Sequence, residues 1–128
     1  METIIGLGNA GCSVAEKFMQ HPQYDVYRID TEKRSGPKFK KIAKRSSHEE
    51  YEDKLPSLKT FLKDAKPPYL FVVGGSGTIS GASLRVLEQL NSKEIYVLYI
   101  KSDVALMSEV SRMQDKIVFN VLQEYARS

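Results

Sequence analysis

Hydrophobic residues along the chain fall into two arrangements, short apolar runs and stripes at helical spacing. The short runs are typical of buried strands, and they occupy residues 4–5, 69–73 and 95–100. A further strand is expected at residues 24–29, where β-prone residues alternate with polar ones. The run at 69–73, Tyr-Leu-Phe-Val-Val, is continuous, which indicates a strand covered on both faces. Two prolines, Pro67 and Pro68, precede it and should end whatever element comes before.

Stretches with apolar residues three or four positions apart lie between these runs and predict amphipathic helices. The expected helices cover residues 13–20, 48–64, 82–90 and a long stretch from Leu106 to Tyr125. Pro56 falls inside the second of them and should kink that helix or mark its start. Residues 31–47 show neither pattern, so we expect a loop there.

Strands that alternate with helices predict a parallel sheet with helices on both faces. Right-handed crossovers make such a sheet doubly wound, so the expected fold class is α/β and Rossmann-like. A chain of 128 residues has room for one domain with one core, spanning residues 1–128.

The sequence has no apolar run near the roughly 18 residues that cross a bilayer. Its one cysteine, Cys12, cannot form an internal disulfide. We therefore expect a cytoplasmic protein without a membrane partner.

Charge is distributed unevenly, although the net charge is only +3. A basic stretch without intervening carboxylates contains Lys33, Arg34, Lys38, Lys40, Lys41, Lys44 and Arg45. Such a stretch would fit a phosphate or nucleic-acid contact. Only one aromatic residue, Phe39, lies within it, so the pattern of a base-stacking surface is missing. We favour a solvated loop and do not expect nucleic acid as a partner.

A first glycine-rich segment, Gly6-Leu7-Gly8-Asn9-Ala10-Gly11, stands between the first strand and the first helix. Glycines there allow a tight turn, and the helix N-terminus offers unpaired N–H groups to an anion. Taken alone, the segment matches the dinucleotide-binding fingerprint, with Asp30 at the end of the second strand as the expected ribose ligand. Glycine turns after strands are common, so this pattern by itself is weak.

A second segment, residues 74–81, has four glycines and three hydroxyl residues in eight positions. That is more than a strand-to-helix turn requires, and such a loop can hold several phosphate oxygens through backbone N–H groups and hydroxyls. It lacks the lysine of a Walker loop. Two such loops after neighbouring strands suggest one polyphosphate held from two sides.

Four segments, in order, resemble the tubulin/FtsZ family. Residues 75–81, Gly-Ser-Gly-Thr-Ile-Ser-Gly, are similar to its signature loop, GGGTGSG in tubulins and GGGTGTG in the bacterial proteins, with Ser76 and Ile79 in place of glycines. Residues 8–13 with Lys17-Phe18 look like the family's first loop and helix, GQCGNQ and a later KF. Residues 29–32 look like the second loop, where FtsZ proteins carry Asn-Thr-Asp. Residues 95–101 resemble the strand after the signature helix.

The resemblance implies GTP or GDP as the ligand. From the first loop the implied contacts are Gly8, Asn9, Ala10 and Gly11. From the second glycine loop they are Gly75, Ser76, Gly77, Thr78, Ile79, Ser80 and Gly81, with Thr78 and Ser80 donating hydrogen bonds. Mg²⁺ would be held mostly by phosphate oxygens and water rather than by protein ligands. Glu32 would stand near it, or else be a solvated loop acid.

In this family the fold continues with base-recognising residues, a central helix and a loop acid that completes the next subunit's active site. We therefore expect the chain to be the N-terminal part of a longer cytoskeletal GTPase that self-associates into filaments. By itself it should bind guanine nucleotide without hydrolysing it, and no catalytic residue is assigned.

Two alternatives remain open. An NAD(P)-binding Rossmann domain would use Gly6, Gly8, Gly11 and Asp30, but would leave residues 74–81 without a role. A degenerate interaction module would have kept the fold and lost the ligand. Ile79, and a stretch from residue 31 to 66 that aligns with nothing in the family, favour that second alternative.

Overall fold

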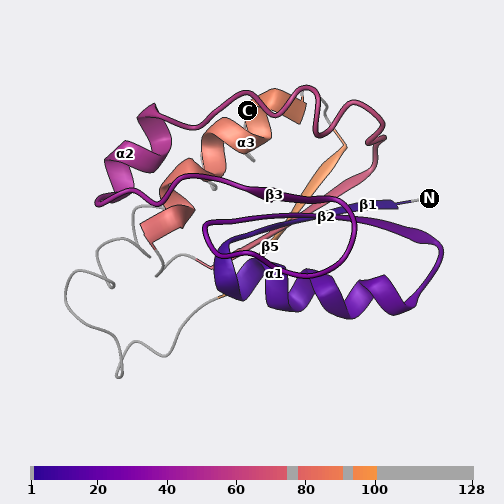
Figure 1. Cartoon of the computed structure of the whole chain (residues 1–128). Coiled ribbons are helices and arrows are strands. Elements are labelled where there is room, and N and C mark those ends of the chain that lie inside the picture. Colours follow the sequence, from indigo (N-terminus) through magenta and orange to yellow (C-terminus); the bar gives the residue numbers. More distant parts are fainter. Residues whose placement is uncertain (1, 75–77, 91–93, 101–128) are drawn as a thin grey trace.

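A five-stranded, all-parallel sheet forms the centre of the molecule in the computed structural model, which describes residues 2–74, 78–90 and 94–100 (Figure 1). The strands are β1 (Glu2–Leu7), β2 (Tyr24–Asp30), β3 (Phe39–Lys41), β4 (Tyr69–Gly74) and β5 (Ile95–Ile100). Their order in the sheet is β3-β2-β1-β4-β5. The chain thus runs outward from β1 in one direction and then from β4 in the other, as in doubly wound nucleotide-binding folds. The predicted α/β class is confirmed at this level.

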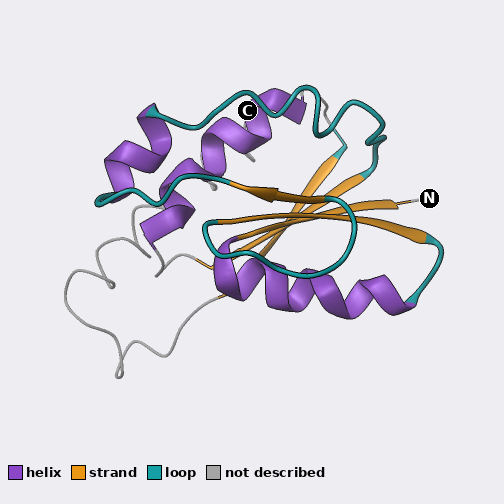
Figure 2. Ribbon diagram, viewed as in Figure 1, coloured by secondary structure: helices purple, strands orange, loops and turns teal. Residues whose placement is uncertain are grey.

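Helices lie on both faces of the sheet (Figure 2). Helix α1 (Gly8–Lys17), extended by a 3-10 turn at Phe18–Gln20, covers one face. Helices α2 (His48–Asp53) and α3 (Ser83–Leu90) cover the other, and a 3-10 turn at Thr78–Ala82 leads into α3. None of the described helices is long and apolar enough to cross a bilayer.

Alternate residues of the strands point to opposite faces of the sheet and pack in two separate cores, as the period of two in a strand requires. The larger core lies under α2 and α3, where Ile5, Tyr27 and Phe71 pack against Val86 and Leu87. The smaller core lies under α1, where Ile4, Val26 and Val72 pack against Ala15. The sheet is therefore covered on both sides around β1, which explains why its central strands read as apolar runs.

The helix predicted to begin at residue 13 begins at Gly8 instead. Gly8 has φ +77°, a left-handed conformation that lets the chain turn from β1 into α1 within one residue. The expected first loop, residues 6–11, is accordingly divided between the end of β1 and the first turn of α1. The sequence pattern missed this because glycines were interpreted as a loop.

The stretch from residue 31 to 47 is not all loop, because it contains β3. This short strand pairs with the end of β2, Arg28 opposite Phe39 and Asp30 opposite Lys41. The guanidinium of Arg28 lies 5.6 Å from the centre of the Phe39 ring. Lysines at two of its three positions hid the strand from a search for apolar runs.

The helix predicted over residues 48–64 is wrong beyond Asp53. Ser47 caps α2, its Oγ accepting from the N–H of Glu50 at 3.1 Å. The helix ends where Lys54 caps it, two residues before Pro56, and a proline disfavours helical backbone in the residue before it. The following irregular segment nevertheless buries Leu58 and Leu62 in the larger core.

Strand β5 forms one edge of the described sheet, and its apolar side chains are less covered than those of β4. Tyr96 is 65% exposed and Leu98 41% exposed. The amphipathic helix predicted from Leu106 to Tyr125 lies outside the described residues, as do Gly75, Ser76 and Gly77 of the second glycine loop.

Two glycines bring α1 unusually close to the sheet. A Cβ at Gly11 would overlap the carbonyl oxygen of Val72 in β4, and a Cβ at Gly6 would lie 2.7 Å from the carbonyl oxygen of Gly11. These obstacles are backbone atoms, which cannot swing away as a side chain can. The first turn of α1 is therefore seated directly on β1 and β4.

We expect Gly11→Ala to lower the free energy of unfolding by about 3 kcal/mol, the upper part of the range for overpacking a core, because the added methyl must displace backbone. Urea denaturation measures it. Ser13→Ala, on the exposed side of the same helix, is the control and should stay within about 0.5 kcal/mol of wild type. Equal stability of the two variants would show that α1 is not seated as described.

Candidate functional site

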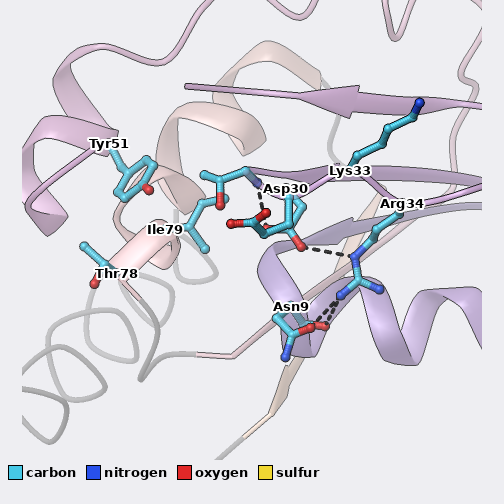
Figure 3. Close-up of a pocket in the computed structure, with 9 residues that line it drawn as sticks. Asn9, Asp30, Lys33, Arg34, Tyr51, Thr78 and Ile79 are labelled. Carbon is cyan, nitrogen blue, oxygen red and sulfur yellow. Dashed lines mark hydrogen bonds and ion pairs between the residues drawn. The ribbon is translucent and has the colours of Figure 1, made fainter. Parts of the chain in front are cut away.

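A cavity of about 510 Å³ opens at the carboxyl edge of the sheet (Figure 3). Its walls are formed by the segments at the ends of β1, β2 and β4 and by helix α2, and the lining residues are Asn9, Asp30, Thr31, Glu32, Lys33, Arg34, Tyr51, Thr78 and Ile79. Ligands of open α/β sheets bind outside the carboxyl ends of the strands, and cavities of this size are typical of small-molecule sites. This cavity is the candidate functional site.

Asn9 is the residue of the first glycine-rich segment that lines the cavity. It lies in the first turn of α1, next to Gly8. Ile79 from the opposite wall lies over Gly8, since a Cβ at Gly8 would be 2.6 Å from the Cγ2 atom of Ile79. The two glycine-rich segments thus meet, as expected for loops that share one ligand, but at this point their contact is apolar.

Asp30, the last residue of β2, is almost fully buried, and both of its carboxylate oxygens accept hydrogen bonds. The N–H of Thr31 donates to Oδ1 at 2.7 Å, and Nε of Arg34 donates to Oδ2 at 3.1 Å. The carboxylate is therefore engaged by the protein itself, which reduces its capacity to receive a ribose hydroxyl.

Arg34 joins three parts of the site. Besides Asp30, it donates from Nη1 to Oε1 of Glu16 at 2.9 Å. Its Nη2 donates to Asn9, to the side-chain Oδ1 at 2.6 Å and to the backbone carbonyl at 3.2 Å. Burial works against the charge of this guanidinium, but the hydrogen bonds to Asp30 and Glu16 raise the pKa of Arg34 above its ordinary value. Arg34 is a fixed cation at the cavity.

Glu16 is itself held in place by the buried side chain of Arg28. Arg28, whose side chain is 1% exposed, donates from Nη1 to Oε2 of Glu16 at 2.6 Å and from Nη2 to the carbonyl of Pro37 at 3.0 Å. Burial alone would raise the pKa of Glu16, but hydrogen bonds and charges from Arg28 and Arg34 lower it below its ordinary value. Glu16 is held as a carboxylate between two arginines.

The opposite wall is formed by Thr78, Ile79 and Tyr51, with the 3-10 turn at Thr78–Ala82 packed beneath α2. The next two residues of that turn are buried. A Cβ at Gly81 would overlap the carbonyl oxygen of His48, and the carbonyl of Ser80 accepts a hydrogen bond from Oγ of Ser83 at 2.6 Å.

The structure brings several of the predicted ligand residues to one place. Those on the cavity wall are Asn9, Asp30, Glu32, Thr78 and Ile79. Gly8, Ala10 and Gly11 form the adjoining first turn of α1, while Ser80 and Gly81 lie beneath the opposite wall. The predicted contacts from 75 to 77 lie outside the described residues.

Four lining residues were not predicted as ligands, namely Thr31, Lys33, Arg34 and Tyr51. The signal for Arg34 was its position in the basic stretch, four residues after Asp30. Another basic residue of that stretch is also paired internally, because Lys38 donates to Oδ1 of Asp25 at 2.6 Å. The stretch is therefore only partly a solvated loop.

Cys12 is buried beside this network and does not offer a nucleophile. Its Sγ donates to the carbonyl of Ile29 at 3.3 Å. Burial raises the pKa of the thiol to about 12, so it stays protonated at neutral pH. Its role is packing.

Searches of protein-family models, of curated proteins and of solved structures each found no match to this chain. In the part of the chain that the structure describes, no group of three or more His, Cys, Asp or Glu side chains is placed to hold a metal ion. A functional assignment therefore depends on the geometry of the cavity and on the sequence motifs.

We expect Glu16→Gln to lower the free energy of unfolding at pH 7 by about 3 kcal/mol, because it leaves the buried Arg28 without an opposite charge. The pKa of Glu16 is lowered from 4.5, so its contribution is complete above that value and is lost as the pH falls through the folded-state pKa. The difference between wild type and variant should therefore shrink below about pH 4.5. Denaturation at pH 7 and pH 3.5 checks both points.

Asp25→Asn is the control for this charge effect. The Asp25–Lys38 pair is exposed, at 35% and 42%, so its loss should cost only about 0.5 kcal/mol. If the two variants lost equal stability at pH 7, Glu16 would not be the anchor of the site.

Proposed function

We propose that this chain is a nucleotide-binding domain whose ligand places its phosphates between the first turn of α1 and the segment after β4. One observation carries the proposal. The ends of β1, β2 and β4 meet around a single cavity, and the walls contain a helix N-terminus, a fixed cation and a threonine. Backbone N–H groups at a helix start, together with a cation, favour an anionic ligand.

The proposed ligand is a guanine nucleotide, GTP or GDP. This choice is supported by the resemblance of residues 75–81 and 8–13 to the tubulin/FtsZ loops. Mg²⁺ would be bound through phosphate oxygens and water, with Glu32 on the cavity wall as the candidate acid near it. We propose binding rather than hydrolysis, because in the tubulin/FtsZ family the acid that completes the active site comes from a later loop of the neighbouring subunit, and no residue of the described site takes that role. The same resemblance supports self-association into filaments by a longer protein as a further part of the proposal.

A dinucleotide such as NAD(P) is the second candidate, and a specific observation favours it. Gly6 and Gly11 allow the close packing of helix and strand that the dinucleotide fingerprint requires, and Gly8 provides the turn. Asp30 stands at the end of β2, where a ribose ligand is expected, although Arg34 and Thr31 already donate hydrogen bonds to its carboxylate. The strand order suits both candidates.

Thermal unfolding with millimolar GTP, GDP, ATP, NAD⁺ and NADP⁺ in the presence of Mg²⁺ tests the proposal. A ligand that binds only the folded state raises Tm by mass action. At a hundredfold excess over Kd it adds about 2.7 kcal/mol to the free energy of unfolding. We expect GTP and GDP to raise Tm, alone or alongside ATP, because the base-recognising residues of the family come later in its fold. A shift with NAD⁺ or NADP⁺ alone would favour the dinucleotide candidate. A Tm unchanged by every ligand would support the degenerate module.

Ile79→Gly restores the residue that the tubulin/FtsZ loop carries. It removes the Cγ2 atom that lies over Gly8 and frees the backbone. We therefore expect GTP affinity to rise about fivefold, a change of about 1 kcal/mol, while stability falls by about 2 kcal/mol through lost packing. Isothermal titration and urea denaturation measure the two effects.

Ile95→Gly is the matched control. Ile95 is also half-buried against the larger core, but it begins β5 and so lies at the amino ends of the strands, opposite the cavity. It should lose comparable stability without any gain in affinity. If Ile79→Gly binds GTP no better than wild type, the second loop does not work as its family counterpart does.

A further inference from the structure

The cavity contains a cation that neither glycine-rich loop provides. Residues 6–11 and 74–81 contain no lysine or arginine, whereas a Walker loop carries its own lysine to the phosphates. In the structure the loop after β2 brings Arg34 to the first turn of α1, with Nη2 donating to Asn9 (Figure 3). The positive charge at the start of α1 therefore comes from the loop after β2 and not from either glycine-rich segment.

We propose that Arg34 binds the phosphate group of the ligand that is seated at the first turn of α1. This assignment rests on the proposed nucleotide-binding function and names the residue that would provide its positive charge. The contact is a charge-assisted hydrogen bond from Nη2 of the guanidinium to a phosphate oxygen.

The present partners of Arg34 fit this role. Nη2 donates to two amide oxygens of Asn9, which are neutral acceptors. An ionised phosphate oxygen is a stronger acceptor, because charge-assisted hydrogen bonds are roughly twice as strong as neutral ones. Nε and Nη1 donate to the carboxylates of Asp30 and Glu16. A phosphate that replaces Asn9 at Nη2 would leave these two carboxylate contacts in place.

Arg34 is also prepared for binding before any ligand arrives. Its side chain is only 17% exposed, so most of its desolvation has already taken place in the folded protein. Glu16 holds Nη1 and is itself fixed by the buried Arg28. A guanidinium that is already ordered loses less side-chain entropy when a ligand binds.

The hydrogen bond between Arg34 and Asn9 also orients the amide of Asn9. Because Oδ1 accepts from Arg34, the Nδ2 group of Asn9 points away from the guanidinium (Figure 3). A phosphate that takes Nη2 from Asn9 would therefore also free the side-chain amide of Asn9 to turn.

Titration calorimetry of GTP, GDP and GMP against wild type, Arg34→Met and Arg34→Lys tests the assignment. We expect Arg34→Met to weaken GTP binding by about 30-fold, as for loss of a hydrogen bond to a charged group. The dependence of Kd on salt should also become shallower. Arg34→Lys keeps the charge and should recover part of the affinity. Lys44→Met, an exposed basic residue away from the cavity, is the control and should bind as wild type does.

The outcomes separate this assignment from the function on which it rests. If wild type binds none of the nucleotides, the proposed function fails and the assignment with it. If wild type binds GTP and Arg34→Met binds it equally well, only the assignment is overturned. A purely structural role for Arg34 would leave the salt dependence of Kd unchanged in Arg34→Met, and this result also overturns the assignment.

The phosphate could instead belong to the ribose of a dinucleotide, since Arg34 lies beside Asp30. The same variants titrated with NADP⁺ and NAD⁺ distinguish this source. A loss of NADP⁺ binding alone in Arg34→Met, with NAD⁺ unaffected, would keep Arg34 as the phosphate ligand and assign it to a ribose phosphate. Equal binding of both dinucleotides by wild type and variant would exclude that source.

Discussion

The carboxylate of Glu16 stands between two arginines and fixes the loop after β2 against α1. Arg28 is buried inside the protein, where an unpaired charge would be strongly destabilising. The same carboxylate holds Arg34, which in turn contacts Asp30 and Asn9. Charges of alternating sign therefore extend from the smaller, α1-covered side of the sheet to the rim of the cavity. The shape of the rim follows from the need to neutralise a charge within the second strand.

Much of the fold could be predicted because its central strands are apolar runs. β4 and β5 were recognised in this way, and α3 by its helical spacing. β3 could not be, since it is held by long-range backbone pairing with β2 while its own residues are mostly lysine. The region of residues 48–64 shows a different kind of error. The spacing there correctly indicated that Leu58 and Leu62 are buried, but burial at helical spacing does not require a helix, and α2 ends before Pro56.

The position of the candidate site could be predicted from the sequence, whereas its interior could not. Glycine-rich segments after two strands, and an acid after a third, indicated the carboxyl edge of the sheet, where the cavity is found. The place of Arg34 depends on Glu16 and Asn9, which are 18 and 25 residues away in sequence. Local patterns carry no information about such pairs. The burial of Ser80 and Gly81 was likewise set by the packing of α2, which no motif in the second loop encodes.

The contact between Gly81 and the carbonyl of His48 also limits how this sequence can change. Any side chain at position 81 would have to push the backbone of α2 aside, so a substitution there is not a local event. The two segments are far apart in the chain, yet they behave as one unit under mutation. A variant library that diversifies the loop after β4 should therefore vary the start of α2 together with it, or hold position 81 fixed.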